Sequence, residues 1–306
     1  MNPSILVIGS TNTDMVIKAD HLPAPGETIL GGNFFMNSGG KGANQAVAAK
    51  RLGGDVTFIA KTGRDIFGER AIRLFEEEGI HIEHMLTDPV HPSGVALITV
   101  DRNAENCIAV ASGANATLSR DDLQPAVGTI KQAGIILMQL EIPLDTVAYV
   151  ASVAAANGVQ VILNPAPACA LDSELLKNIS IITPNKKEAE MLSGITITDI
   201  ENTLAAARAI RDQGPGTVII TLGSQGALIC NADMEELIPA PVVKAVDTTA
   251  AGDVFNGALA VALSEGMSLT DAVTFGCHAA ALSVTRLGAQ SAAPHRHEVE
   301  SLFKPS

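Results

Sequence analysis

The stretch from residue 135 to residue 163, IILMQLEIPLDTVAYVASVAAANGVQVIL, decides the fold class. It contains two short apolar runs, 135–138 and 159–163, on either side of an Ala-rich segment at 144–157. Short apolar runs that alternate with helical segments are typical of parallel strands joined by crossover helices. The stretch therefore predicts one strand–helix–strand unit of a parallel sheet.

The same alternation continues toward the end of the chain. Apolar runs at 179–182 and 218–222 predict two more strands, and the run at 5–8 predicts a first strand. The helices that we expect after residue 180 are 186–193, 201–213, 250–264 and 269–285. The expected fold is α/β: a doubly wound, mostly parallel sheet with helices on both faces.

The first third of the chain has a different pattern. Pro and Gly turns separate four short, partly alternating runs: 14–19, 28–35, 94–101 and 107–112. A helical unit around 42–52 and 69–78 lies between the second run and the third. They predict a small separate β-sheet lid, built from about 14–37 and 93–112, that covers a site or pairs with a second copy. We expect one domain over residues 1–306.

Charge and cysteine usage exclude several classes of protein. A net charge of −13 and a pI near 4.9 argue against nucleic acid and membrane surfaces as partners. The chain starts without a basic region before its first apolar run, and we expect no transmembrane segment and a cytoplasmic protein. The four cysteines are widely scattered without metal-ligand spacing, which favours buried, small apolar residues: Cys107, Cys169, Cys230 and Cys277.

The first segment with candidate chemistry is SGGKGANQA at residues 38–46, which opens a predicted helix. Its glycines let the backbone approach a ligand closely. A nucleotide P-loop is excluded, because Phe35 and Gly42 stand where that motif needs Gly and Ser or Thr. The alternatives are a glycine turn required only for packing and, favoured by Lys41 and Asn44, a site for a small polar ligand.

The second segment is DTTAAGD at residues 247–253, where small residues meet the start of a predicted helix. Free N–H groups and the helix dipole make such a start an anion site suited to a transferring phosphoryl group. Alone, Asp253 would be read as a helix-stabilising charge, but its small and hydroxylated neighbours favour the anion site.

Two further segments follow predicted strands at the carboxyl edge of the sheet, where open α/β sheets bind ligands. Asn185 and Glu188 lie three residues apart, as in a helix capping box, and a ligand role is compatible with that. Residues 221–226 form either a hairpin turn or a loop that faces a nucleotide.

Together these segments resemble the ribokinase family of sugar kinases, the phosphofructokinase B group. The resemblance covers the whole chain in the order of the family, through GGKGAN at 39–44, NPAP at 164–167, Pro184-Asn185 with Glu188, and DTTAAGD at 247–253. It implies an ATP-dependent kinase that uses a sugar and ATP, with Mg²⁺ and an activating K⁺, and a homodimer formed through the lid sheet.

The resemblance also implies a role for each matching residue. The sugar would contact Asn12, Asp14, Gly40, Lys41, Gly42, Asn44 and Glu141. Asp253 would be the base that takes the proton of the attacking hydroxyl, beside an anion hole made by Ala250, Ala251 and Gly252. The nucleotide would contact Asn185, Thr221, Leu222, Gly223, Ser224, Gln225, Gly226, Gly252 and Cys277. Glu188 would hold Mg²⁺ through water, and the monovalent cation would lie among Asp247, Thr249, Ser283, Arg286 and Gly288.

The substrate that the resemblance favours is D-ribose, phosphorylated at its 5-hydroxyl. The alternatives are 2-deoxyribose, another pentose, a ketohexose, a nucleoside, or a sugar sensor that has lost catalysis. A nicotinamide dehydrogenase is disfavoured, because the first predicted strand does not run into GxGxxG.

Overall fold

Parallel strands form the centre of an eight-stranded sheet in the computed structural model, which describes residues 4–103 and 105–302. In spatial order the strands are β14 (Glu235–Ile238), β13 (Ala227–Cys230), β12 (Thr217–Thr221), β11 (Ile181–Ile182), β10 (Gln160–Leu163), β9 (Ile135–Met138), β1 (Ile5–Ile8) and β4 (Val56–Ile59). The strands from β12 to β4 are parallel, whereas β13 and β14 form an antiparallel edge. The predicted mostly parallel sheet is confirmed.

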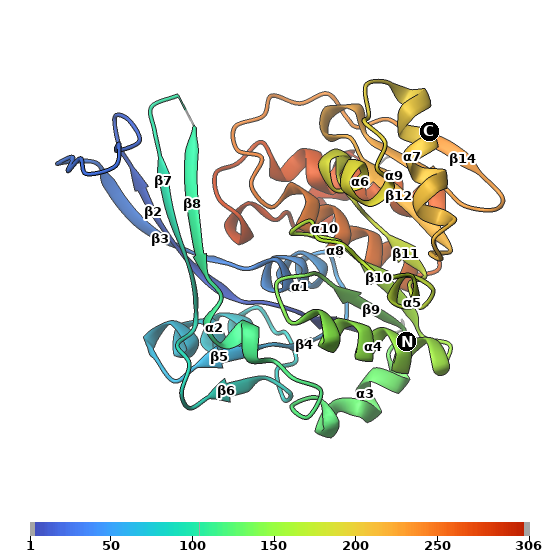
Figure 1. Ribbon diagram of the computed structural model, residues 1–306, viewed down its shortest axis with the longest axis horizontal. Helices are drawn as coiled ribbons and strands as arrows, with labels where there is room; N and C mark the ends of the chain where they lie inside the picture. The colour runs from blue at the N-terminus through green and yellow to red at the C-terminus, as the bar shows by residue number, and fades with distance from the viewer. Residues whose placement is uncertain (1–3, 104, 303–306) are drawn as a thin grey trace.

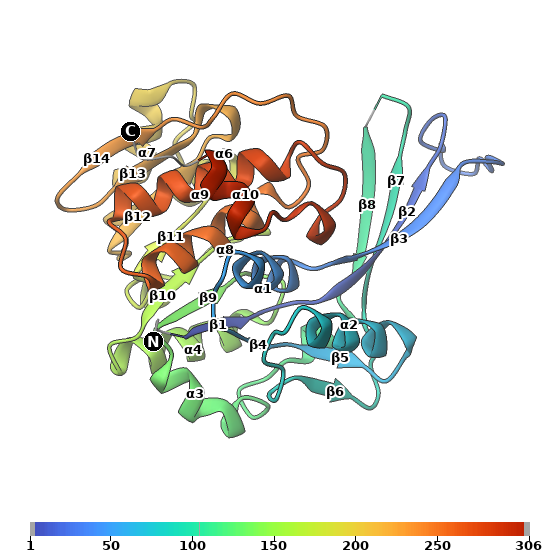
Figure 2. The ribbon, with the colours of Figure 1, turned by 180° about the vertical axis from the view of Figure 1, so that it is seen from behind.

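Helices cover both faces of this sheet (Figures 1 and 2). In β1, Ile5 and Val7 enter one hydrophobic cluster while Leu6 and Ile8 enter the other, as the two-residue period of a strand requires. The first cluster is shared with α1 (Lys41–Arg51), α2 (Ile66–Glu77), α8 (Ala251–Ser264), α9 (Leu269–Ser283) and α10 (Arg296–Leu302). The second is shared with α3 (Val127–Gln132), α4 (Leu144–Ala156), α5 (Ser173–Leu176), α6 (Lys186–Ser193) and α7 (Ile200–Arg211).

A separate four-stranded sheet projects from this body (Figure 1). Its order is β3 (Asn33–Gly39), β2 (Asn12–Lys18), β7 (Gly94–Val100) and β8 (Asn106–Ala111). A two-stranded sheet, β5 (Lys61–Gly63) and β6 (Leu86–Asp88), lies near its base. The small sheet was predicted, but the strand expected at 28–35 was placed wrongly. Gly31 and Gly32 have φ of 101° and 96°, so regular strand begins only at Asn33.

Helices α1 and α8 pack against each other with almost no space between them. A Cβ atom at Gly257 would lie 2.8 Å from the backbone nitrogen of Ala49 and 2.9 Å from the Cβ of Ala48. Glycine on α8 and alanine on α1 therefore allow the two backbones to approach. This contact joins the helix that opens with Lys41 to the helix that carries Asp253.

Other expectations have mixed outcomes. Residues 221–226 form the hairpin turn between β12 and β13, with a 3₁₀ turn at Gly223–Gln225. Cys230 and Cys277 are buried as expected, but Cys169 is only half-buried and Cys107 is exposed on β8, so the expectation of four buried cysteines was wrong. No helix within the described residues has the length and apolar character needed to cross a membrane.

Candidate active site

Polar residues follow several neighbouring strands where these reach the carboxyl edge of the large sheet. Ser10 comes after β1, Glu141 after β9, Asn164 after β10 and Asn185 after β11. Since β1 lies between β9 and β4, the chain changes direction across the sheet at β1. Such a switch point is where ligands bind to open α/β sheets.

Asp253 is the most enclosed carboxylate at this edge. It lies in the first turn of α8 with 5% of its surface exposed. Its Oδ2 accepts a hydrogen bond from Asn44 Nδ2 at 2.9 Å, and its Oδ1 accepts one from Gln45 Nε2 at 2.9 Å. Burial raises the pKa of Asp253, whereas Lys41, Asn44 and Gln45 oppose that rise by stabilising the ionised form. A buried, oriented carboxylate of this kind is suited to accept a proton.

The start of α8 is open to a ligand. Because the helix begins at Ala251, the N–H groups of Gly252 and Asp253 have no intrahelical acceptor. Gly252 is exposed, and a Cβ atom there would meet nothing within 4 Å. The N–H of Ala251 is already used, since it donates to the carbonyl of Thr248 at 3.3 Å. Ala250 has a φ of 59°, a left-handed conformation that costs free energy in a residue with a side chain and often marks a functional turn.

Lys41 lies between several carboxylates at the start of α1. Its backbone N–H donates to Glu141 Oε2 at 3.0 Å, and the hydroxyl of Ser10 donates to the same oxygen at 2.5 Å. Burial lowers the pKa of Lys41, but the attraction of Asp253, Glu141 and Glu188 outweighs it and leaves the pKa raised. The ammonium group therefore remains charged among these acids.

Asp14 and Asn12 lie at the base of the small sheet. Burial, followed by repulsion from Glu141 and Asp253, raises the pKa of Asp14 to about 6. Asn12 is held by Asn115, whose Nδ2 donates to Asn12 Oδ1 at 2.8 Å. The Asp14 carboxylate packs over Gly39, where a Cβ atom would come within 2.3 Å of Oδ2. The glycine at position 39 is thus required by the position of Asp14.

Asn44 has one amide atom in use and one without a partner. Its Nδ2 bonds Asp253, whereas its buried Oδ1 has no hydrogen-bond partner within the described residues. Buried polar atoms are almost always paired, so an orphaned acceptor at this edge indicates a ligand donor, such as a hydroxyl group.

Asn185 and Glu188 form the capping box that the sequence predicts. Asn185 Oδ1 accepts from the N–H of Glu188 at 3.0 Å, and Glu188 Oε2 accepts from the N–H of Asn185 at 2.8 Å. Burial is the main cause of the raised pKa of Glu188. A parallel bridge joins Asn185 to Thr221, which brings the 221–226 turn beside the start of α6.

The remaining nucleotide candidates differ in exposure. Gly223, Ser224 and Gln225 are exposed in the turn. Cys277, on α9, is only 5% exposed and belongs to the hydrophobic core, and burial raises its pKa to about 12. It remains a thiol and offers little surface to a ligand.

The residues expected around a monovalent cation come from two segments that lie together. Asp247 Oδ1 accepts from the N–H and hydroxyl of Thr249 at 2.9 and 2.6 Å, and Asp247 Oδ2 accepts from the N–H of Gly288 at 2.9 Å. The Ser283 carbonyl accepts from the N–H of Arg286 at 3.1 Å, and the Arg286 guanidinium pairs with Glu298. The carboxylate of Asp247 therefore holds the two segments together by accepting from Thr249 and Gly288.

Several buried residues of the site carried no assigned role in the sequence reasoning. They are Ser10, Gln45, Asn115, Gln139 and Asn164. Gln45 directly follows Asn44, and Gln139 and Asn164 directly follow strands, so proximity to predicted site segments was the signal available.

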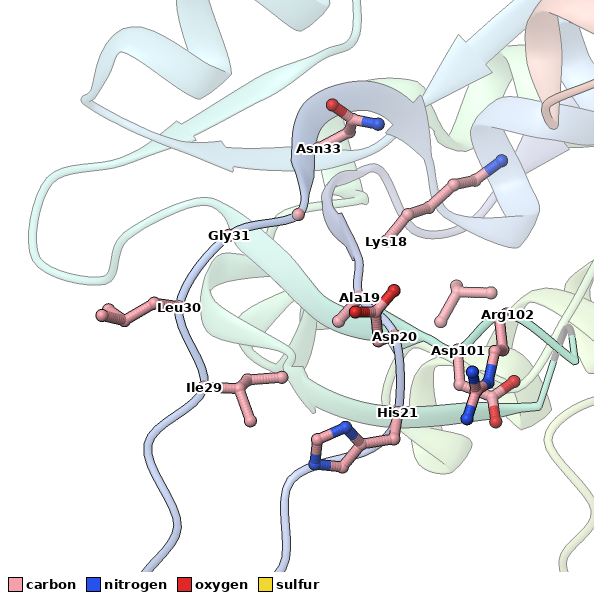
Figure 3. Close-up of a pocket in the computed structure, with 12 residues that line it drawn as sticks. Lys18, Ala19, Asp20, His21, Ile29, Leu30, Gly31, Asn33, Asp101 and Arg102 are labelled. Carbon is pink, nitrogen blue, oxygen red and sulfur yellow. The ribbon is translucent and has the colours of Figure 1, made fainter.

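A cavity of about 730 Å³ lies elsewhere, at the outer end of the small sheet (Figure 3). Lys18, His21, Asn33 and Arg102 are among the residues that line it. None of the sequence-predicted site residues contributes to its lining. The carboxyl edge, not this cavity, combines the buried carboxylate with a free helix start.

Comparison with known proteins agrees with this geometry. Residues 2–296 match the model of the pfkB family carbohydrate kinases, and the chain belongs to that family. It is therefore a carbohydrate kinase by descent as well as by the layout of its site.

Within this family, the chain is similar to kinases of ribose and of deoxyribose. Ribokinase of Haemophilus influenzae is 46% identical over 298 residues, which covers 97% of each chain. Deoxyribokinase of Salmonella typhimurium is 38% identical over 291 residues and 95% of each chain. The solved structure of Arabidopsis thaliana ribokinase complexed with ribose and ATP superimposes with a TM-score of 0.93 at 32% identity, over the whole of both chains.

Proposed function

We propose that this protein transfers the γ-phosphoryl group of ATP to the 5-hydroxyl of D-ribose, which yields ribose 5-phosphate and ADP. The observation that carries the proposal is the buried Asp253 carboxylate beside the free N–H groups that start α8. The similarity to ribokinase over nearly the full chain supports ribose as the sugar.

In this reaction Asp253 accepts the proton of the 5-hydroxyl as its oxygen attacks the γ-phosphorus. The O–P bond to ribose forms while the bond to the bridging oxygen of ADP breaks, and ADP leaves with that electron pair. Negative charge develops at the start of α8. The N–H groups of Gly252 and Asp253 lie there, together with the turn at Ala250 and Ala251. Positioning and charge stabilisation provide most of the catalysis of such a transfer.

The sugar is held by both sheets. Asn44 Oδ1 accepts one hydroxyl, which satisfies its orphaned lone pairs. Asn12 and Asp14 contact others from the small sheet, and Glu141 does so from the end of β9. Gly40, Lys41 and Gly42 complete the site. A Cβ atom at Gly40 would lie 2.8 Å from the backbone nitrogen of Asn12, and one at Gly42 would lie 2.7 Å from the backbone nitrogen of Ser10, so the two glycines let the start of α1 pack against the loop after β1. The small sheet, about 14–37 and 93–112, acts as the lid of a single domain.

The nucleotide binds across the start of α6 and the turn after β12. Asn185 and residues 221–226 contact it from one side and Gly252 from the other. We propose that Glu188 holds Mg²⁺ through water. Its two oxygens already accept from Asn185, but each carboxylate oxygen can accept a further hydrogen bond. When bound, Mg²⁺ would neutralise charge on the phosphates.

We also propose K⁺ activation, a homodimer and a cytoplasmic location. Asp247 brings together the two segments that would form the monovalent-cation site, because it bonds both Thr249 and Gly288; Ser283 and Arg286 lie in the second of these segments. Exposed apolar side chains on the small sheet support its role as the subunit interface, among them Phe34, Leu97, Ile108 and Val110. Light scattering of the purified chain measures its mass in solution, and a monomer at all concentrations would contradict the proposed dimer.

The proposed cytoplasmic location rests on the need of the reaction for ATP.

The deciding experiment is an ADP-release assay with Mg²⁺ and K⁺ across ribose, 2-deoxyribose, arabinose, xylose, fructose, tagatose and a nucleoside. The best substrate is then repeated with Na⁺ in place of K⁺. Preference for ribose by at least about tenfold in kcat/KM supports the proposal. The similarity to a deoxyribokinase makes 2-deoxyribose the first alternative substrate. A preference for 2-deoxyribose would leave the proposed mechanism unchanged and replace ribose as the proposed substrate. Binding without turnover would favour a sugar sensor.

A further inference from the structure

A chain of buried amide side chains lies directly beneath Asp253. Gln139 Nε2 donates to Gln45 Oε1 at 2.5 Å, and Gln45 Nε2 donates both to Asp253 Oδ1 at 2.9 Å and to Asn164 Oδ1 at 3.1 Å. Asn164 Nδ2 then donates to the carbonyl of Thr183 at 3.2 Å. Gln45 and Gln139 have no exposed surface, and Asn164 is 7% exposed. The chain connects the base to the ends of three strands.

The hydrogen bonds fix which way the Gln45 amide faces. A primary amide has two N–H donors and one carbonyl acceptor. Because Gln139 donates to Gln45, the Gln45 oxygen must face Gln139, and its two N–H donors are then directed at Asp253 and Asn164. The reversed amide would place two oxygens together at Asp253, so only one orientation is compatible with an ionised base.

The two oxygens of Asp253 consequently have different surroundings. Oδ2 is bonded by Asn44, whose other amide atom is the orphaned acceptor of the sugar site. Oδ1 is bonded by Gln45, which is fully buried and therefore cannot touch a substrate. We propose that Gln45 is a positioning residue: it holds Oδ1 toward the interior so that Oδ2 receives the proton, and Gln139 sets its orientation.

The charged groups that face Asp253 come from four elements. Lys41 on α1 attracts its negative charge, whereas Glu141 after β9, Asp14 on β2 and Glu188 on α6 repel it. The pKa of Asp253 is already raised, chiefly by burial, and the Gln45 hydrogen bond works against that rise. Loss of the Gln45 donor should therefore raise the pKa further and shift the acid limb of the kcat profile to higher pH.

The test compares Gln45→Met with Thr146→Val in the full-length chain, using ribose, ATP and Mg²⁺. Methionine keeps the length of the side chain and removes the donor. Thr146→Val removes an equally buried hydrogen bond on α4, from Thr146 Oγ1 to the carbonyl of Leu118 at 2.8 Å, that belongs neither to the amide chain nor to the site. For Gln45→Met we expect kcat to fall about ten- to a hundredfold, with the acid limb displaced upward by about one pH unit and the KM for the sugar changed less than about threefold.

A purely structural role would instead give Gln45→Met the behaviour of Thr146→Val: a lower free energy of unfolding in urea and an acid limb that stays in place. That result would overturn the inference. If Gln45→Met does not fold, Gln139→Met provides the second test. Without the Gln139 donor, Gln45 can turn its oxygen toward a protonated Asp253 and stabilise the neutral acid, so the acid limb should shift in the same direction by a smaller amount. An unshifted limb in a folded Gln139→Met would also overturn it.

The inference rests on Asp253 as the base, and its failure can be told apart from failure of the proposed function. A near-normal kcat for Asp253→Asn would show that Asp253 is not the base. If Asp253→Asn is inactive and the acid limb of Gln45→Met is unshifted, Asp253 remains the base and only the proposed role of Gln45 is excluded.

Discussion

Replacing Asp14 with Asn tests the electrostatics of the site most directly. Asp14 is half-buried on β2, and within residues 4–103 and 105–302 no side-chain or backbone donor hydrogen-bonds its carboxylate. Burial, Glu141 and Asp253 together raise its pKa from 3.8 to about 6. The folded protein therefore binds this proton more tightly than the unfolded chain does.

The sign of the effect on stability follows from that difference. Because the pKa is higher in the folded state, the free energy of unfolding falls as the pH rises from about 4 to about 6 and stays lower above that window. A shift of about two units corresponds to about 3 kcal/mol at 1.36 kcal/mol per unit. Asparagine has the same shape and does not ionise. The stability of Asp14→Asn relative to the parent should thus increase by about 3 kcal/mol between pH 4 and pH 7.5.

Urea unfolding followed by far-ultraviolet circular dichroism measures this difference, since the chain contains no tryptophan. Asp20→Asn, in the exposed loop after β2, controls for the loss of one negative charge. In the same variant the KM for the sugar should rise by about tenfold or more, because an ionised acceptor is lost. A stability difference that is the same at both pH values would refute the reasoning.

Three further changes test the assigned roles. Asp253→Asn should lower kcat by about 10²- to 10⁴-fold while calorimetry shows sugar affinity within about threefold of the parent; near-normal kcat would exclude Asp253 as the base. Glu188→Gln should raise the Mg²⁺ concentration needed for half-maximal activity, and an unchanged Mg²⁺ titration would contradict its role. Gly39→Ala places a methyl group where Asp14 Oδ2 lies, so the KM for the sugar should rise much more than the KM for ATP. Equal changes in both constants would mean that the turn, not Asp14, was disturbed.

Local patterns predicted local structure well. The capping box of Asn185 and Glu188 is present, and α7 ends close to the predicted position, before Gly214. These features depend on residues within one or two turns of each other. The strand expected at 28–35 failed because Gly31 and Gly32 adopt positive φ, which residue type alone permits but does not require. The β13–β14 edge was missed, since β13 is only Ala227–Cys230 and β14 is mostly exposed.

Contacts across the fold were beyond what the sequence could predict. Gln45 bonds Gln139 and Asp253, which are 94 and 208 residues away, and no spacing rule connects them. The orphaned oxygen of Asn44 and the raised pKa of Asp14 likewise depend on burial that only the assembled sheets create. The sequence could therefore predict which segments meet at the carboxyl edge, but not which atoms are paired there.

The absence of a side chain at Gly257 fixes the distance between α1 and α8, and with it the distance between Asn44 and Asp253. Helix α1 carries Asn44, which contacts the acceptor sugar in the proposed function, and α8 carries Asp253 one turn before Gly257. A misplacement of about 1 Å can cost a reaction a hundredfold in rate. With the backbone of Ala49 2.8 Å from the position of a Cβ at residue 257, a single methyl group would push the two helices apart by a comparable amount. In the proposed function, the spacing between the acceptor sugar and the base therefore leaves little tolerance.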